Sequence, residues 1–550
     1  MGSTAVSAEQ GAPLLQIDAL SVALPPNGDR TFAVRDVTLT VGRGECVCLV
    51  GESGSGKSVT GQAILGMLPE GLRQAGGSIA FTGAPLPTDP KALAHLRGRR
   101  IGLISQEPLA SLDPVMTVGR QLDEVLAVHG ATNRSSRRAR ILELFAAVRL
   151  PDPERIYRSY PHQLSGGQCQ RIVIAMALAH NPALLIADEP TTALDVTTQA
   201  EILRLIATLR ADFGAGLLFI THDLAVVADI ADRVLVMQEG EVVESGTRDA
   251  LFSDPRHPYT RKLLAALPKR HERPLPPIDA SPTLAADKLA VHYKVPTSLF
   301  RYRDFPAVTD ASLVLRRGET HGVVGESGSG KSTLVRALLN LEPIAAGRIM
   351  VAGQEILPGS PPVPRALRRK MQIVLQDPYT ALDPRQSIGD AVSEGAIIHG
   401  ASARQARART MELMAQVGLP ARSYDRFPHE FSGGQRQRIC IIRALAVEPE
   451  ILIADEAVSA LDVSIQAQIL ELFASLQAQM GFALLFVTHD LRVAGAICDH
   501  ISVMENGRIV EQGTTAQVLD APRADYTRKL VAAIPDRGNA ARSSLAGGRP

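Results

Sequence analysis

An eight-residue glycine-rich segment occurs twice in this chain and constrains its fold more than any other feature. The letters G-E-S-G-S-G-K-S fill residues 51–58 and return 274 positions later, at residues 325–332. Three further segments, S-G-G-Q, A-D-E and T-H-D, each return 267 positions later in the same order. A period this long indicates a duplicated domain rather than a solenoid of short repeats. The 550 residues therefore predict two similar halves.

Each glycine-rich segment follows an apolar run, which predicts a buried strand, and precedes a helical pattern. In the first half the strand is expected at residues 46–50 and the helix at residues 61–68. Strand, G-x-x-x-x-G-K-S and helix together are the context of a P-loop, whose backbone N–H groups surround phosphate oxygens. The predicted nucleotide-binding residues are Gly51, Glu52, Ser53, Gly54, Ser55, Gly56, Lys57 and Ser58, and Gly325, Glu326, Ser327, Gly328, Ser329, Gly330, Lys331 and Ser332.

Two acidic residues follow a second apolar strand in each half. Asp188 and Glu189 come directly after residues 184–187, and Asp455 and Glu456 repeat the pattern. Ligands of open parallel sheets lie beyond the carboxyl ends of the strands. We expect the first acid to hold Mg²⁺ together with the P-loop serine, and the second to orient or deprotonate an attacking water.

The S-G-G-Q segments have the spacing of a capping box, which starts a helix at Ser165 and at Ser432. Two glycines in a first helical turn cost about 1 kcal/mol each relative to alanine. They are explained if the backbone must approach a ligand closely, and a helix N-terminus suits an anion. The segments therefore predict a second set of contacts to a phosphate-bearing ligand.

Leu164 to Gln168, and Phe431 to Gln435 in the second half, resemble the signature of ABC ATPases. The resemblance extends over residues 15–268 and 285–535. It implies an α/β fold with two P-loop NTPase domains in tandem, each with a RecA-like core, an antiparallel β subdomain and an α-helical signature subdomain. In that family the two domains pair head to tail, and each ATP lies between the P-loop of one and the signature of the other. The implied signature contacts are Ser165, Gly167, Gln168, Ser432, Gly434 and Gln435.

The same resemblance assigns further residues to the two ATP sites. Gln106 and Gln376 match the family's Q-loop glutamine, and His222 and His489 match its switch histidine. Tyr293 matches the aromatic residue that stacks on adenine, whereas the first half has Leu24 at that position and Phe32 as a poor substitute. The implied catalytic residues are Glu189, Glu456, His222, His489, Gln106 and Gln376. The implied Mg²⁺ ligands are Ser58, Gln106, Asp188, Ser332, Gln376 and Asp455.

A third motif lies near the end of each half and points to one branch of the family. H-P-Y-T at residues 257–260, echoed by Y-T-R at residues 526–528, resembles the C-terminal extension of peptide/nickel importer ATPases. That resemblance implies an ATP-hydrolysing subunit of a bacterial importer for di- or oligopeptides or peptide-like substrates; nickel and glutathione stay open as alternatives. The implied partners are two transmembrane permease subunits and, indirectly, an extracytoplasmic substrate-binding protein.

Composition adds several expectations. The net charge of +1 and the short Pro-rich linker argue against nucleic acid as a partner and against a soluble ABC ATPase acting on ribosomes or DNA. No apolar run is long enough to span a bilayer and the N-terminus does not resemble a signal peptide, so we expect a peripheral protein on the cytoplasmic face of the inner membrane. Five scattered cysteines predict buried thiols. Since residues 240–290 and 500–550 contain no cysteine, no iron–sulfur cluster is expected beside ATP and Mg²⁺.

The domain boundaries follow from composition. We expect a flexible N-terminus at 1–14, a first ATPase domain at 15–268, a Pro-rich linker at 269–286, a second ATPase domain at 287–535 and a flexible tail at 536–550.

Overall fold

The computed structural model describes residues 13–26, 30–130, 133–191, 194–270, 281–298, 301–361, 363–459 and 461–534. Apart from residues 13 and 14, the two ends predicted to be flexible lie outside the described residues, as does most of the predicted linker. The described residues form two compact units. The first contains residues 13–194 and 198–267, and the second contains residues 195–197 and 268–534. The predicted division into two similar halves is thus seen as two units of the same architecture.

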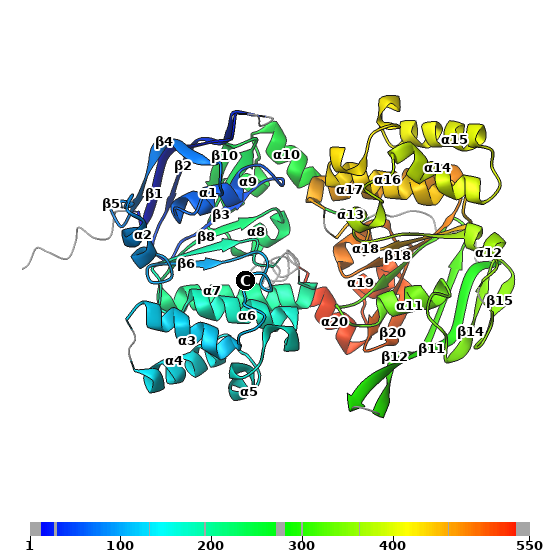
Figure 1. Ribbon diagram of the computed structural model, residues 1–550, viewed down its shortest axis with the longest axis horizontal. Coiled ribbons are helices and arrows are strands. Elements are labelled where there is room, and N and C mark those ends of the chain that lie inside the picture. The colour runs from blue at the N-terminus through cyan, green and yellow to red at the C-terminus, as the bar shows by residue number, and fades with distance from the viewer. Residues whose placement is uncertain are drawn as a thin grey trace, which may run out of the picture. The chain divides into compact units, whose positions relative to one another are not determined.

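Unit 1 is built on two sheets (Figure 1). The four-stranded antiparallel sheet has the order β2 (Phe32–Val41), β1 (Leu15–Ala23), β4 (Arg73–Phe81), β5 (Ala84–Pro85). The six-stranded sheet has the order β10 (Glu241–Thr247), β9 (Arg233–Gln238), β3 (Cys46–Val50), β8 (Gly216–Thr221), β7 (Leu184–Asp188), β6 (Ile101–Ile104). Only its β9–β10 pair is antiparallel. All five residues of β3 are buried, as expected for a strand covered on both faces.

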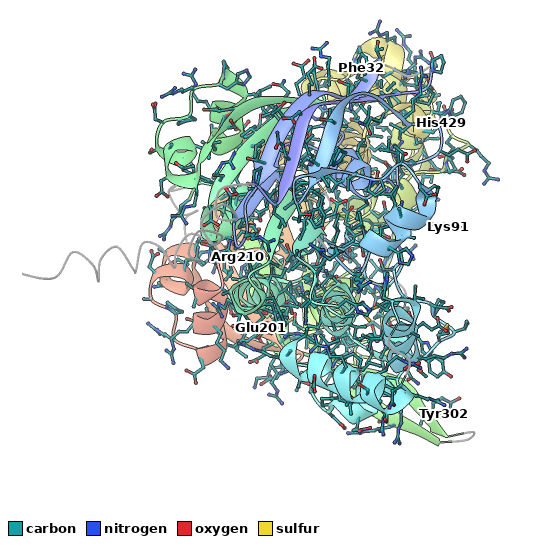
Figure 2. The ribbon with its side chains drawn as sticks, turned by 90° about the vertical axis from the view of Figure 1, so that its left-hand side faces the viewer. Phe32, Lys91, Glu201, Arg210, Tyr302 and His429 are labelled. Atoms are coloured by element: carbon teal, nitrogen blue, oxygen red, sulfur yellow. The ribbon has the colours of Figure 1, made fainter. Side chains whose placement is uncertain are left out.

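Unit 2 repeats both sheets. Its antiparallel sheet has the order β12 (Arg301–Arg316), β11 (Pro282–Ser298), β14 (Ala346–Val351), β15 (Gln354–Ile356). Its six-stranded sheet has the order β16 (Met371–Val374), β17 (Ile451–Asp455), β18 (Ala483–Thr488), β13 (Thr320–Val324), β19 (His500–Glu505), β20 (Arg508–Thr514). β11 begins at Pro282, inside the stretch predicted as linker. The β11–β12 hairpin is longer than its counterpart in unit 1 and carries the exposed Tyr302 toward its tip (Figure 2).

Helices follow nearly the same chain order in both units. The first half has α1 (Lys57–Ile64), α2 (Pro90–Leu96), α3 (Val118–Val128), α4 (Arg134–Ala147), α5 (Pro153–Tyr157), α6 (Gly166–Ala177), α7 (Val196–Phe213), α8 (Leu224–Ile230), α9 (Arg248–Ser253) and α10 (Pro258–Ala265). The second half has α11 (Lys331–Leu338), α12 (Arg365–Lys370), α13 (Pro378–Ala381), α14 (Ile388–Ile398), α15 (Ala403–Gln416), α16 (Gly433–Leu445), α17 (Val463–Met480), α18 (Leu491–Ile497), α19 (Thr515–Asp520) and α20 (Asp525–Ala532). Among the described residues of unit 1, α13 has no helical counterpart, and a 3-10 helix at Ala421–Ser423 stands in unit 2 where unit 1 has α5.

The helix after the first P-loop begins earlier than predicted. The sequence pattern places it at residues 61–68, but α1 spans Lys57–Ile64. Its N-cap is Gly56, whose φ of 103° is in the left-handed region that glycine favours. The loop therefore ends at this glycine, and Lys57 and Ser58 belong to the first helical turn.

The hydrophobic core of each unit has two parts, one on each face of its six-stranded sheet. In unit 1 the face toward the antiparallel sheet buries side chains such as Ile17, Leu49 and Leu235. The opposite face packs against helices α3 to α8, through residues such as Phe145 and Phe219. Within the described residues, no helix is long and apolar enough to cross a membrane. The predicted α/β class with repeated mixed sheets and helices is confirmed.

Candidate nucleotide sites

The P-loop of unit 1 and its predicted catalytic residues lie at one edge of the six-stranded sheet. β3, β8, β7 and β6 are neighbouring parallel strands, so their carboxyl ends meet at that edge. The P-loop follows β3 and His222 follows β8. Glu189 follows β7, and Gln106 lies two residues beyond β6. Residues separated by up to 171 positions in the chain are gathered by this topology.

The P-loop of each unit is folded around its own lysine. Lys57 Nζ donates hydrogen bonds to the carbonyl oxygens of Gly51 and Glu52, both at 2.8 Å. Lys331 makes the same two bonds, at the same distances, in unit 2. Burial lowers the pKa of Lys331, although the nearby Glu456 carboxylate opposes this shift. An ammonium group held inside the loop is placed to meet the charge of a bound phosphate.

Asp188 and Asp455 lie at the ends of β7 and β17 with mostly buried carboxyl groups. Ser58 Oγ donates to Asp188 Oδ1 at 2.9 Å. Asp455 Oδ1 is buried and has no hydrogen-bond partner among the described residues. Burial and the charge of the adjacent glutamate raise the pKa of both aspartates. A serine hydroxyl beside a desolvated carboxylate is the oxygen donor set that Mg²⁺ takes when phosphates supply further ligands, so these residues fit that ion.

Glu189 connects the predicted catalytic residues of unit 1. Its Oε2 accepts a hydrogen bond from Gln106 Nε2 at 3.1 Å, and its Oε1 lies 3.1 Å from His222 Nδ1. Its backbone has a φ of 45°, in the left-handed region that non-glycine residues rarely adopt. The backbone N–H of Glu189 donates to the carbonyl oxygen of Ile220, at 2.9 Å, which holds it in this conformation. Strain at a carboxylate of this kind is typical of functional sites.

Glu456 has the same surroundings in unit 2. It accepts from Gln376 Nε2 at 3.2 Å, lies 3.4 Å from His489 Nδ1 and has a φ of 48°. The hydrogen bond from His489 lowers the pKa of Glu456, and the Lys331 charge adds to the effect. Burial alone would lower the pKa of His489, but the Glu456 carboxylate outweighs burial and raises it. The carboxylate is therefore kept ionised, as a group that accepts a proton or orients water must be.

The signature residues form a separate cluster at the start of α6 and α16. Both predicted capping boxes are present: Ser165 Oγ accepts from the N–H of Gln168, and Gln168 Oε1 accepts from the N–H of Ser165. Ser432 and Gln435 repeat this pair. The structure adds a reason for the second glycine. A Cβ on Gly167 would lie 2.7 Å from Thr198 Cγ2, and one on Gly434 would lie 2.6 Å from Ile465 Cγ2.

The first glycine of each pair, Gly166 or Gly433, has open space around its Cβ position. The close approach that the double glycine predicts is therefore made in part by a neighbouring side chain rather than by a ligand. Gly166 and Gly433 remain accessible to a ligand.

Tyr293 lines a cavity of about 510 Å³ in unit 2. The cavity is also lined by residues of the P-loop, the start of α11, β12 and the β19–β20 turn, and by two predicted catalytic residues; they include Gly330, Lys331, Ser332, Gln376 and Glu456. Phe305, paired with Tyr293 across the β11–β12 ladder, also lines it and was missed by the sequence analysis. The sequence carries no signal for Phe305, because its position opposite Tyr293 depends on the strand register of the folded hairpin.

Unit 1 has no aromatic residue at these two positions. Leu24 stands where unit 2 has Tyr293, and its N–H donates to the carbonyl oxygen of Thr31, the position of Phe305. Phe32 lies at the start of β2 (Figure 2) and lines a hollow of about 750 Å³ with Arg30 and Arg35. Among the described residues that line this hollow, none belongs to the P-loop. This differs from Tyr293, whose cavity is lined by P-loop residues.

Two family models match parts of both halves of the chain. Residues 34–192 and 308–459 match the family described as ABC transporter. Residues 243–287 and 510–550 match the family described as oligopeptide/dipeptide transporter, C-terminal region.

Two curated relatives cover most of the chain. It is 47% identical over 530 residues to the peptidoglycan transport ATP-binding protein YejF of Agrobacterium fabrum, covering 95% of this chain and 96% of that protein. It is 44% identical over 561 residues to the glutathione import ATP-binding protein GsiA of Escherichia coli K12, covering 95% of this chain and 89% of that protein.

Proposed function

This chain belongs to the ABC transporter family of ATP-binding proteins, and from that membership we propose that it powers the import of peptides or peptide-like molecules across a bacterial inner membrane. Proteins of this family are ATPases coupled to transport, and this chain is one of them. The observation that carries the peptide assignment is the match of residues 243–287 and 510–550 to the oligopeptide/dipeptide transporter region, once in each half.

The residues around each P-loop have different roles in phosphoryl transfer. Lys57 and the N–H groups of its loop bind the outer phosphates of ATP. Ser58, Asp188 and Gln106 are the residues that would hold Mg²⁺, which when bound neutralises part of the phosphate charge. Glu189 orients or deprotonates the attacking water, and His222 contacts the γ-phosphate while its Nδ1 stays against Glu189. Lys331, Ser332, Asp455, Gln376, Glu456 and His489 act in the same way in unit 2.

Two complete sites also need the signature residues. Following the family arrangement, we propose that the halves pair head to tail when ATP binds. The first P-loop would then be completed by Ser432, Gly434 and Gln435, and the second by Ser165, Gly167 and Gln168. After hydrolysis the two halves would separate. The loops that contain Gln106 and Gln376 would transmit this movement to two membrane permease subunits. An extracytoplasmic binding protein would select the substrate, and the chain itself would sit as a peripheral protein on the cytoplasmic face.

The test is purification of the protein from detergent-solubilised membranes. We expect two hydrophobic permease proteins to co-purify, and the reconstituted complex to hydrolyse ATP faster when a peptide-loaded binding protein is added. Co-purification of ribosomes or nucleic acid without permeases would contradict the proposal and favour a non-transport ABC ATPase.

Glutathione is the second candidate substrate, because the 44% identical relative is a glutathione importer subunit. The same reconstituted complex separates the candidates. Stimulation by a binding protein loaded with peptide or with muropeptide, but not with glutathione or nickel, is expected. Stimulation by glutathione alone would replace the peptide assignment.

A further inference from the structure

The H-P-Y-T motif of unit 1 and its Y-T-R counterpart in unit 2 each place a tyrosine hydroxyl directly on a P-loop. In unit 1 the hydroxyl of Tyr259, the second residue of α10, accepts a hydrogen bond from the backbone N–H of Glu52 at 3.1 Å. In unit 2 the hydroxyl of Tyr526, in α20, accepts from the N–H of Glu326, also at 3.1 Å. Glu52 and Glu326 are the second residues of their P-loops. The contact is made twice, at equivalent positions, by segments 207 and 200 residues apart in the chain.

The tyrosines are held in place by a carboxylate on the preceding strand. Glu244, on β10, accepts the N–H of Arg256 at 2.8 Å and the N–H of His257 at 3.0 Å. These bonds fasten the chain just before α10. The ring nitrogen Nδ1 of His257 then accepts the N–H of Tyr259, which caps the helix.

Unit 2 has the equivalent hydrogen bonds to a strand carboxylate, but it has no histidine at the position of His257. Glu511, on β20, accepts the N–H groups of Arg523 and Ala524 at 2.8 and 3.0 Å. A continuous path of hydrogen bonds therefore runs in each unit from the last strand of the sheet, through the start of the C-terminal helix, to the phosphate loop.

The hydroxyl acts from a desolvated position. Tyr259 is 7% exposed and belongs to the core between sheet and helices. Burial raises the pKa of Tyr526, so its hydroxyl stays protonated and neutral in the working pH range. A peptide N–H that faces such a buried acceptor loses most of the hydrogen-bond energy if the acceptor is removed without replacement.

The position of the bond within the P-loop gives it a consequence for nucleotide binding. The later part of the loop turns its N–H groups toward phosphate, and Lys57 Nζ is bonded to the carbonyl oxygens of Gly51 and Glu52. The peptide group between Gly51 and Glu52 is therefore held by its carbonyl oxygen, Gly51 O, from the lysine side and by its N–H from the tyrosine side. Fixing this peptide fixes where the lysine can reach.

We propose that Tyr259 and Tyr526 are positioning residues that preorganise the two P-loops, so that the C-terminal extension of each half sets the affinity of that half for ATP. This inference rests on the assignment of ATP to the two P-loops made above. Each tyrosine acts on its own unit, because its bond is made to the P-loop of that unit.

The test uses the full-length protein with Tyr259→Phe, Tyr526→Phe, or Tyr424→Phe as a matched control. Phenylalanine keeps the ring packing and removes only the hydroxyl. Tyr424 also has a buried hydroxyl, 3.4 Å from Ser393 Oγ, but it lies in the helical part of unit 2. Site-specific affinity is measured by photolabelling with 8-azido-ATP and Mg²⁺, with labelled peptides assigned to each unit by mass spectrometry.

We expect Tyr259→Phe to raise the 8-azido-ATP concentration that gives half-maximal labelling roughly threefold to tenfold in unit 1 only. Tyr526→Phe should do the same in unit 2 only. Turnover at saturating ATP should stay within about twofold of wild type, because the catalytic groups are untouched. The control should leave both sites unchanged. Unchanged affinity in the tyrosine variants, or equal weakening of both sites by either one, would overturn the proposal.

Hydrogen–deuterium exchange without nucleotide tests the same bond independently of ATP. In Tyr259→Phe the peptide containing residues 51–58 should exchange faster, while the peptide containing residues 325–332 should not. Faster exchange throughout unit 1 would show a merely structural role and overturn the proposal. If the wild-type protein failed to photolabel in either unit, the ATP assignment would be refuted, whereas the exchange result would still decide the role of the tyrosine.

Discussion

At the scale of single residues, Glu189 and Glu456 bring together the properties that a catalytic carboxylate needs. Each has a positive φ, a glutamine amide donor and a histidine ring within 3.4 Å. Burial raises the pKa of the neighbouring aspartates, Asp188 and Asp455, whereas the hydrogen bond from His489 lowers the pKa of Glu456. Adjacent acids whose pKa values are moved apart suit different roles, which supports the proposed metal binding by the aspartate and water activation by the glutamate.

We expect Glu189→Gln combined with Glu456→Gln to reduce steady-state ATP hydrolysis by at least about 100-fold, because a general base contributes a factor of that order. ATP binding should survive, since glutamine keeps the size and hydrogen bonds of the site. Phosphate release and nucleotide binding would be measured on the same preparation. Glu201→Gln, at an exposed carboxylate paired with Arg171, is the control. Undiminished turnover in the double variant would refute the role of these glutamates.

The aromatic residues of the cavity in unit 2 predict an asymmetry between the ATP sites. Stacking of a base on an aromatic side chain is worth about 1–3 kcal/mol. Tyr293→Ala should therefore weaken nucleotide binding about tenfold or more in unit 2 and leave unit 1 unchanged. Leu24→Ala, at the equivalent position, should have little effect on either. Photolabelling resolved by unit measures both, and equal weakening of the two sites by Tyr293→Ala would contradict the assignment.

At the scale of elements, the first turn of α14 packs against a ring. A Cβ on Gly389 would lie 2.1–2.3 Å from ring atoms of Tyr424, and Gly119 faces Tyr157 in the same way in unit 1. Alanine would gain about 1 kcal/mol of helix propensity. Overpacking of a core contact costs about 1–3 kcal/mol, and at these distances the upper part of that range applies. The clash therefore outweighs the propensity.

Gly389→Ala should lower the free energy of unfolding by about 1–2 kcal/mol, seen as a lower urea midpoint. Combining it with Tyr424→Ala provides the control. The two changes should cost less together than the sum of their separate effects, because removing the ring removes the clash. Strict additivity would show that the ring is not what excludes a side chain at position 389.

At the scale of the whole molecule, the two units differ in a buried polar cluster at the start of the strand that precedes the P-loop, β13 in unit 2. In unit 2 His500 Nδ1 lies 2.8 Å from Glu319 Oε1, and Ser502 Oγ lies 2.8 Å from the Nε2 of the buried His321. The N–H of Arg316 donates to Glu319 as well. In unit 1, Val47 stands in place of His321, and Glu45 pairs with Arg233 instead of a histidine.

Unit 2 is therefore expected to be the more acid-sensitive part. Burial lowers the pKa of His321 from its ordinary value of 6.5 to about 4. Between these values the unfolded chain binds a proton that the folded chain does not, so stability falls as the pH falls from about 6.5 toward 4. The loss for this residue is roughly 3 kcal/mol across the window.

Urea unfolding at several pH values between 4.5 and 7 would measure the effect, with His321→Val as the comparison. Valine is the residue that the other half uses at this position. As the pH is lowered, the urea midpoint of the unit 2 transition should decrease in the wild type, and it should decrease less in the variant. Parallel curves would show that His321 does not cause the sensitivity. Glu319, whose pKa is lowered, loses its contribution at lower pH in both proteins.

The amino-acid sequence by itself determined the duplication, the α/β class and the identity of the chemical groups. The reason is that P-loops, acidic strand ends and capping boxes are local: their chemistry follows from neighbours such as Gly56, Lys57 and Ser58. Local patterns were less able to place boundaries, as the early start of α1 shows. A helix begins where backbone geometry changes, and the left-handed Gly56 decides that point.

Only the tertiary structure decided which distant groups meet. Glu189 joins Gln106 and His222 because four parallel strands end at one edge, and Phe305 joins Tyr293 through the register of a hairpin. The bond from Glu52 to Tyr259 spans 207 residues and depends on where α10 docks. Such contacts are set by strand order and packing, which the motifs leave undetermined because each motif carries information about its own segment alone.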